Sequence, residues 1–205
     1  MVLTRGAYRA SRAITRWLPN EVLTEIIRAA LQADQATLCR VSKLFHDLSL
    51  PILNRAAYLP LTPGANIIVR EFCAAIIHNP SREDAIRFFS LRPLFGYWPE
   101  WKSSVVPDLS DWLTKAMKSM LRLEHLVIHH YVVSAIQCTF PRLVSCDMKF
   151  ERAVPDATLV SFLQRHPDLT RIRIETCRGI DIPNGTRISW LQLEHFDGPA
   201  GLIPC

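Results

Sequence analysis

The sequence predicts a mixed fold, in which an all-α helical module over residues 17–57 is followed by an α/β solenoid over residues 58–205. Two observations support this prediction. In the first segment, apolar residues recur every three or four positions, which is the spacing of one face of a helix. In the second segment, short strand patterns with alternating apolar residues return repeatedly and are separated by helical stretches. Residues 1–16 form a separate basic leader.

Composition limits the classes of protein to which the chain can belong. Its 205 residues are 49% apolar, which suffices to build a buried core. No apolar run reaches the roughly 18 residues of a membrane span, and no signal-peptide stretch begins the chain. We therefore expect a protein of the cytoplasm, the nucleus or both, with no membrane partner and with its six cysteines as free thiols.

The net charge of +5 is concentrated in the leader. Arg5, Arg9, Arg12 and Arg16 recur every three or four residues without an acidic neighbour, so a helix would carry them as one basic stripe. Such a stripe is typical of a mitochondrial transit peptide or of a nucleic-acid-binding arm. We favour a solvated leader, because the helical module follows it without a cleavable spacer.

The first helix is expected to begin at Pro19. Proline suits the first turn of a helix, and Glu21 suits the positive end of the helix dipole. Two adjacent apolar stripes follow, namely Val22, Ile26 and Ala30, and Leu23, Ile27 and Leu31.

A second helix is expected to start at an Asp34 cap, to carry apolar residues from Leu38 to Leu48 and to stop at Pro51. A short third helix is expected over residues 52–57. A module of about 40 residues is too small to bury both stripes of the first helix by itself. We therefore expect part of this apolar surface to meet another protein or the following domain.

Residues 17–55 combine several short motifs at fixed separations. A Leu18-Pro19 opening is followed by the paired aliphatic residues of the first helix and then by a Val41-Ser42-Lys43-x-Phe45 turn. This combination resembles the F-box. Ser42 stands where many members have cysteine, and Phe45 stands where many have tryptophan, a variant that is familiar in fungal-type sequences.

The resemblance implies a function for the whole chain. In that family this surface binds the Skp-type adaptor of a cullin-RING ubiquitin ligase, and the chain beyond it selects a protein substrate. The implied role is that of a substrate-recognition subunit of a Skp-cullin-F-box type ubiquitin ligase, with the adaptor, cullin and an unknown protein substrate as partners. The implied adaptor contacts are Leu18, Pro19, Leu23, Ile26, Ile27, Val41, Ser42 and Phe45.

Other interpretations of the helical module stay open. It could be an ordinary helical hairpin that packs on the C-terminal part, or a non-catalytic protein-interaction scaffold outside any ubiquitin ligase. A DNA-reading helix-turn-helix is disfavoured, because Arg40 and Lys43 are the only basic residues between positions 39 and 49.

The C-terminal segment repeats a Leu-x-x-Leu-x-Leu pattern, with helices expected over residues 65–78, 109–122 and 157–165. This arrangement resembles the divergent leucine-rich repeats that often follow an F-box, although the consensus asparagine is missing. It implies a leucine-rich-repeat-like solenoid that buries its helix side and presents a concave sheet. The copies begin at Leu123, Leu143, Leu169 and Ile188, with weaker ones at Ala56 and Ile86.

The register of these copies predicts which residues share the concave face, and a slip of one residue would invert the prediction. The first row is Tyr58, Phe88, His125, Ser145, Arg171 and Trp190. The second row is Ser90, Val127, Asp147, Arg173 and Gln192. The third row is Arg92, His129, Lys149, Glu175 and Glu194.

Two features of the C-terminal segment suggest substrate contacts. Four cations of the predicted rows would form a basic patch suited to an acidic or phosphorylated degron, although a solvated face is the alternative. The aromatic loop over residues 92–107 has the composition of an interface hot spot, although it could instead cover an end of the solenoid. The aromatic residues of this loop are Phe95, Tyr97, Trp98 and Trp101. The candidate substrate contacts are Arg92, Trp98, Trp101, His125, Lys149, Arg171, Arg173 and Trp190.

Nothing in the sequence has the pattern of a catalytic or metal site. The cysteines and histidines lack the close spacing that brings metal ligands together, and Cys146 occupies a core position of its repeat. Phosphate-cradling glycine loops and nucleophile elbows are missing. We therefore expect a non-enzymatic chain without cofactor, metal or nucleic-acid partner. Because no polar segment caps the last repeat, the sequence leaves open a shortened chain.

Overall fold

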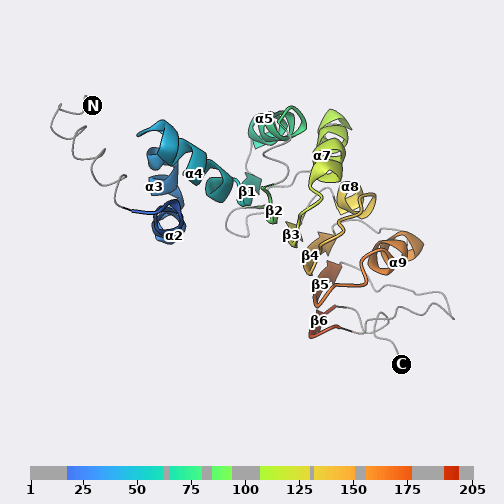
Figure 1. Cartoon of the computed structure of the whole chain (residues 1–205). Coiled ribbons are helices and arrows are strands. Elements are labelled where there is room, and N and C mark those ends of the chain that lie inside the picture. Colours follow the sequence, from blue (N-terminus) through green and yellow to red (C-terminus); the bar gives the residue numbers. More distant parts are fainter. Residues whose placement is uncertain are drawn as a thin grey trace. The chain divides into compact units, whose positions relative to one another are not determined.

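The computed structural model divides into two compact units, residues 1–55 and residues 56–205. It describes residues 18–61, 65–79, 85–93, 107–129, 132–150, 156–176 and 192–198. The fold is mixed, with helices in the described part of the first unit and both helices and a parallel sheet in the second (Figure 1). Within the described residues, no helix has the length and apolar character needed to cross a membrane.

The first unit, which we call the helical unit, contains helices α2 (Asn20–Ala29), α3 (Gln32–Leu38) and α4 (Lys43–Leu53). Pro19 precedes α2 in an extended conformation, as expected for a residue that introduces a helix. Ser42 caps α4, because its hydroxyl accepts a hydrogen bond from the Phe45 amide at 3.3 Å. Helix α4 contacts both α2 and α3, so it forms the centre of this unit.

The bounds that we predicted for the second helix were wrong. The stretch expected as one helix is divided into α3 and α4 by a turn at residues 39–42. Asp34 lies in the first turn of α3 and does not cap it. Pro51 does not stop α4 but lies in its last turn. There it removes one hydrogen bond, to the carbonyl of the exposed Asp47, which water can satisfy.

The predicted third helix over residues 52–57 was also wrong. Ile52 and Leu53 complete α4, and Ala56 begins the first strand of the second unit. Hydrogen bonds from the amides of Asn54 and Arg55 to carbonyls of α4 complete the helix end, so the chain leaves α4 directly into the sheet.

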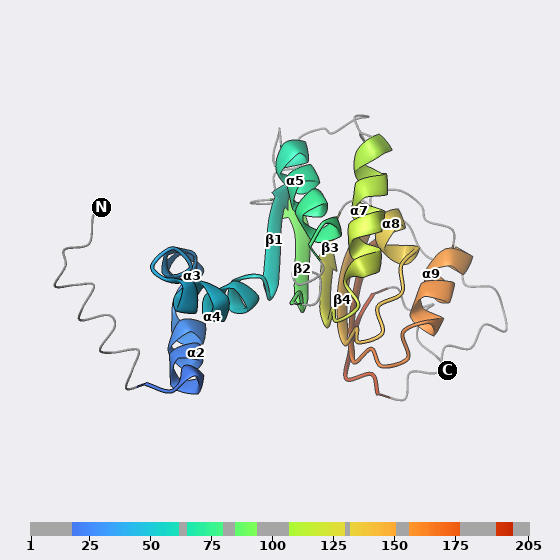
Figure 2. The same cartoon turned by 45° about the horizontal axis from the view of Figure 1, so that its top comes forward.

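The second unit, which we call the sheet unit, is built on six parallel strands that pair in the order of the sequence (Figure 2). The strands are β1 (Ala56–Leu61), β2 (Phe88–Pro93), β3 (His125–Ile128), β4 (Ser145–Phe150), β5 (Arg171–Thr176) and β6 (His195–Asp197). The helices that connect them lie along one face of the sheet (Figures 1 and 2). These helices are α5 (Ala65–Ile77), α7 (Pro107–Ser119), α8 (Val132–Ile136) and α9 (Asp156–Gln164).

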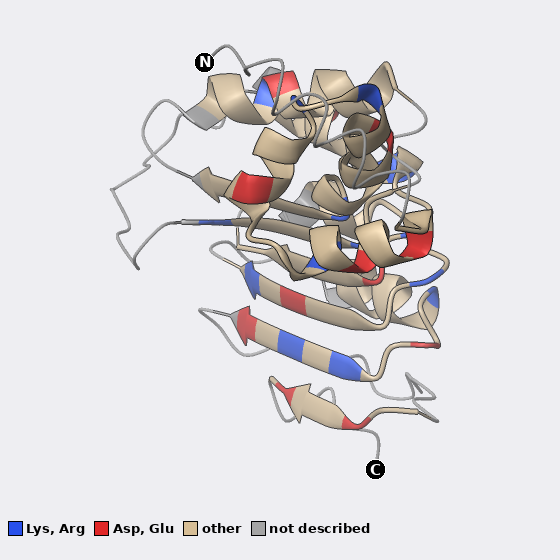
Figure 3. Cartoon of the chain, turned by 60° about the vertical axis from the view of Figure 1, so that its left-hand side comes forward, with Lys and Arg blue, Asp and Glu red and all other residues tan. Residues whose placement is uncertain are grey.

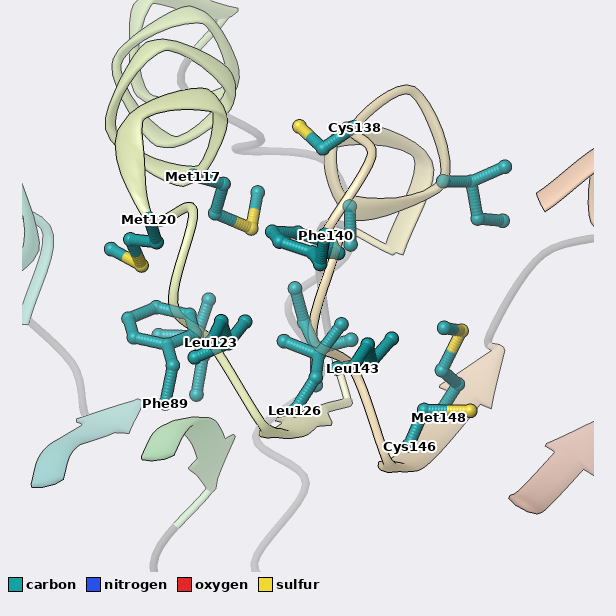
Figure 4. Packing of buried hydrophobic residues seen from close by; sticks show 14 of the residues in the cluster. Phe89, Met117, Met120, Leu123, Leu126, Cys138, Phe140, Leu143, Cys146 and Met148 are labelled. Atoms are coloured by element: carbon teal, nitrogen blue, oxygen red, sulfur yellow. The ribbon is translucent and has the colours of Figure 1, made fainter. Parts of the chain in front are cut away.

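The core of the sheet unit lies between this helix layer and the sheet. Alternate residues of each strand point into it, as the strict burial alternation of β3 and β4 shows. Leu126 and Ile128 of β3 pack against Met117 and other apolar side chains in one continuous cluster (Figure 4). The predicted inward positions of β3, β4 and β5 are therefore confirmed.

The predicted strand register is confirmed in the centre of the sheet and wrong at both ends. Phe88, His125, Ser145 and Arg171 pair in one row, as expected. Tyr58, however, pairs with Ser90 and not with Phe88. This shift of two residues keeps every side chain on its expected face, so the apolar pattern could not reveal it.

The last strand also differs from the prediction. It was expected over residues 188–193, but β6 begins at His195, which pairs with Arg171. Phe196 is the residue of β6 that packs against the core. Trp190 lies outside the described residues, whereas Gln192 and Glu194 precede the strand and do not extend the rows.

A buried histidine joins two parts of the sheet unit. The Nδ1 atom of His166 is 2.6 Å from the Phe162 carbonyl oxygen, and its Nε2 accepts a hydrogen bond of 2.9 Å from the Phe140 amide. These partners fix a neutral ring with its proton on Nδ1. Burial lowers the pKa of His166 below its ordinary value of 6.5, against the opposing effect of the Phe162 carbonyl. His166 is therefore a structural residue and not a metal ligand or catalytic base.

We predict that the free energy of unfolding falls as the pH is lowered from about 7 to about 5. Because burial lowers the pKa of His166 in the folded chain, the unfolded chain binds a proton at this histidine more readily than the folded chain, so acid favours the unfolded state. His166 makes its full contribution to the free energy of unfolding above the pKa that it has in the unfolded chain. This contribution is lost as the pH falls towards the lower pKa that it has in the folded chain. Urea denaturation at several pH values measures this slope, and His166→Gln should reduce it. An identical slope in both proteins would contradict the assignment.

Candidate functional site

Helix α2 exposes an apolar ridge. Pro19, Val22 and Ile26 follow one another at helical spacing and lie on one side of the helix, and we call this set the α2 ridge. The side chains of Val22 and Ile26 are 42% and 54% exposed. An isolated exposed aliphatic residue is ordinary, but a row of them on a short helix is typical of a surface that another protein covers.

Within α2 the neighbouring apolar residues are buried, whereas Leu31, the third residue of the predicted stripe, follows the helix and is 75% exposed. Leu23 and Ile27 are 3% and 0% exposed, so their side chains form the core of the helical unit. We predicted both residues as adaptor contacts, and their burial corrects that prediction: a partner cannot reach them while the unit is folded. Their role is to hold α2 in place, so that the α2 ridge faces outward.

The other residues predicted to contact an adaptor divide into exposed and supporting positions. Val41 is exposed, whereas Leu18 and Phe45 are half-buried. Ser42 is exposed, but its hydroxyl caps α4. Val22 and Leu31 are exposed apolar residues that we did not include among the contacts, although both lie in the predicted stripes.

Gln35 fixes the end of α2. Its side-chain amide donates hydrogen bonds of 3.0 Å to the carbonyl oxygens of Ile27 and Ala30, and the residue is buried. Ile27 lies in the last turn of α2, and Ala30 directly follows the helix. The Ile27 carbonyl also accepts a hydrogen bond from the Ala30 amide, so Gln35 adds a second bond there and joins the end of α2 to α3.

We predict that Gln35→Glu destabilises the helical unit by at least about 2 kcal/mol, because a buried carboxylate would face two carbonyl oxygens. Hydrogen exchange of the α2 amides in the full chain measures the effect, and exchange should accelerate. Gln32→Glu is the matched control, since it makes the same change at the exposed first residue of α3, where the helix dipole tolerates an acid. Equal protection of α2 in both variants would show that Gln35 is not a structural cap.

The face of the sheet opposite the helix layer carries the other set of candidate contacts, and we call it the outer face. Over β1 to β3 it presents three rings, Tyr58, Phe88 and His125, which we call the aromatic strip. The ring centroids of Tyr58 and Phe88 are 4.9 Å apart, and those of Phe88 and His125 are 6.2 Å apart. Tyr58 is 55% exposed. Phe88 and His125 are half-buried beside it, and aromatic rings in contact at a surface are typical of sites that bind proteins.

Over β4 to β6 the strands carry residues of both signs of charge (Figure 3), and these residues form a network of ion pairs. Lys149 lies 2.8 Å from Glu175, and Arg173 lies 2.7 Å from Glu175 and 3.3 Å from Asp197. Arg171 lies 3.8 Å from Glu194. The hydrogen bond from Lys149 is the main cause that lowers the pKa of Glu175.

These pairs correct the prediction of a basic patch. Arg92, Lys149, Arg171 and Arg173 do share the outer face, but carboxylates offset the last three. A surface with alternating charges does not attract phosphate as an uncompensated arginine cluster does. His129 adds no fixed positive charge, because burial lowers its pKa below 6.5 despite the nearby Asp147 at 3.8 Å.

The predicted aromatic loop cannot be compared with the structure. Phe95, Tyr97, Trp98 and Trp101 lie outside the described residues, as does Trp190. Of the predicted substrate contacts, the structure brings Arg92, His125, Lys149, Arg171 and Arg173 onto one face. Tyr58 and Phe88 lie on the same face. Both belong to the predicted first row, but we did not include them among the candidate substrate contacts.

The described part of the chain contains no group of three or more side chains that could hold a metal ion. Cys73, Cys138 and Cys146 are buried, and burial raises the pKa of their thiols to about 12, 11 and 12, respectively. These thiols stay protonated near neutral pH and are poor nucleophiles. Each therefore serves as a small apolar residue of the core.

The comparisons with known proteins give no relative. No protein-family model, no curated protein and no solved structure matches the chain. The function has to be argued from the surfaces described above.

Proposed function

We propose that the chain is a substrate-recognition subunit of a Skp-cullin-F-box type ubiquitin ligase. In this proposal the helical unit is an F-box-like module that binds the Skp-type adaptor, and the sheet unit is a leucine-rich-repeat-like solenoid that holds a protein substrate. The observation that carries the proposal is the exposed α2 ridge on a helix whose other apolar stripe is buried.

Energetic considerations support docking at the α2 ridge. Covering an aliphatic side chain contributes up to about 2 kcal/mol, so a partner that covers Val22 and Ile26 gains a useful part of its binding energy there. Leu31 and Val41 of the same unit are also exposed, which enlarges the apolar surface that this unit offers. The buried Leu23 and Ile27 keep α2 rigid, so that little conformational entropy is lost on docking.

The sheet unit supports the second half of the proposal. Its helix side is closed by a continuous core, whereas its outer face presents the aromatic strip and the charged network. A chain that binds an adaptor with one unit and a substrate with the other raises the effective concentration of the substrate near the ligase. The chain itself then performs no chemistry.

The test is co-precipitation of the full chain from cells, followed by identification of the adaptor and cullin. The proposal expects both proteins in the same complex, with cullin bound through the adaptor. Adaptor without cullin would point to a scaffold outside a ubiquitin ligase. Absence of the adaptor under conditions that preserve a known F-box complex would contradict the proposal.

A further inference from the structure

Arg92 differs from the other cations of the outer face. It is exposed on β2, and among the described residues no carboxylate lies within ion-pair distance of it. Lys149, Arg171 and Arg173 each have such a partner. Arg92 is therefore the cation of the described outer face that is best able to bind an acidic group from another molecule.

The aromatic strip lies next to this cation. Phe88, Ser90 and Arg92 are alternate residues of β2, so their side chains share the outer face. Tyr58 pairs with Ser90 across the strands, which places it between Phe88 and Arg92 along the sheet. At the usual rise of a strand, the region from Phe88 to Arg92 spans roughly 13 Å.

We propose that the aromatic strip and Arg92 together bind an extended protein segment that has one aromatic or aliphatic side chain and a single carboxylate either two or four residues away. The spacing follows from the strand geometry, because alternate residues of an extended segment also face one side at about 7 Å intervals. The inference rests on the proposed function, in which the outer face holds the substrate, and it names the class of substrate.

The charges around the site favour a bound segment with one acidic group over a segment with several. Asp147 and Glu175 lie on the same face, near His129 and Lys149, and would repel a second or third negative charge. His129 lies beside Arg92 but is neutral near pH 7, so it does not enlarge the positive charge. The site therefore discriminates against multiply phosphorylated segments.

The experiment uses the full chain and a fluorescein-labelled peptide, Ser-Gly-Phe-Ser-Glu-Gly-Ser, with binding followed by fluorescence anisotropy. Replacing the glutamate of the peptide by lysine, or its phenylalanine by serine, should each weaken binding about tenfold or more. Arg92→Glu should weaken binding of the glutamate peptide and restore binding of the lysine peptide. Such a reversal of preference cannot result from a purely structural role of Arg92.

Arg142→Glu is the matched control, because it makes the same change at an exposed arginine of the sheet unit that precedes β4 and is not one of the candidate contacts. It should leave peptide binding unchanged. Equal loss in both arginine variants, or tighter binding of a doubly phosphorylated peptide, would overturn the inference. Adaptor capture without peptide binding would overturn this inference alone. Peptide binding without adaptor capture would support it and contradict the proposed function.

Discussion

Ile26→Asp is expected to weaken binding of a Skp-type adaptor at least about 100-fold, because it would bury a carboxylate in an apolar interface. Ile26 is 54% exposed in the free chain, so an aspartate there remains solvated and the fold is not disturbed. Pro19→Ala, combined with Ile26→Asp, should remove the remaining capture. The measurement is the affinity of each purified variant for the adaptor, with circular dichroism to check helix content.

The matched control for this prediction is Leu121→Asp. Leu121 is also a large exposed apolar residue, but it belongs to the sheet unit. The same loss of apolar surface at Leu121 should leave adaptor binding unchanged. Unaltered binding in Ile26→Asp would exclude the α2 ridge as the docking surface. A parallel loss in both variants would indicate a non-specific effect of added negative charge.

Leu126→Lys is expected to unfold the sheet unit at room temperature. Leu126 is buried at the centre of the core cluster, where a lysine would lose the packing of the leucine and place an ammonium group among apolar side chains. The expected cost is more than about 4 kcal/mol, which is a large part of the stability of a typical domain. Loss of protection from hydrogen exchange across β3 and β4 measures this effect.

Val127→Lys is the control for the core prediction, because it makes a similar change one residue further along the same strand. Val127 points to the outer face and pairs with Asp147 of β4, so a lysine there can reach water and a carboxylate. The free energy of unfolding is expected to change by less than about 1 kcal/mol. Similar destabilisation of both variants would contradict the assignment of the two faces of the sheet.

Periodicity was enough to predict much of the fold. The alternation in β3, β4 and β5 is a local signal, since a strand that is half buried must alternate apolar and polar residues. The start of α2 directly after Pro19 was equally local, because the residue types required there are few. These parts of the prediction needed no knowledge of distant contacts.

Tertiary contacts determined the parts that were predicted wrongly. Which apolar stripe of α2 is buried depends on where α4 packs, because the stripe of Val22 and the stripe of Leu23 are both apolar in sequence. Helix α4 continues to Leu53 past Pro51, because a proline in the last turn removes only one helical hydrogen bond. The balance of charge on the outer face depends on strand pairing, which brings Glu175 next to Lys149 from 26 residues away.

The most direct test of the central claim is a calorimetric titration of the full chain with a purified Skp-type adaptor. The proposed function predicts saturable binding of one adaptor per chain with a Kd of about 1 µM or tighter, and loss of the signal in Ile26→Asp. The proposed function would be contradicted if no binding heat appeared up to about 100 µM adaptor. Both proteins must be folded in this titration, and the result must hold at a second temperature.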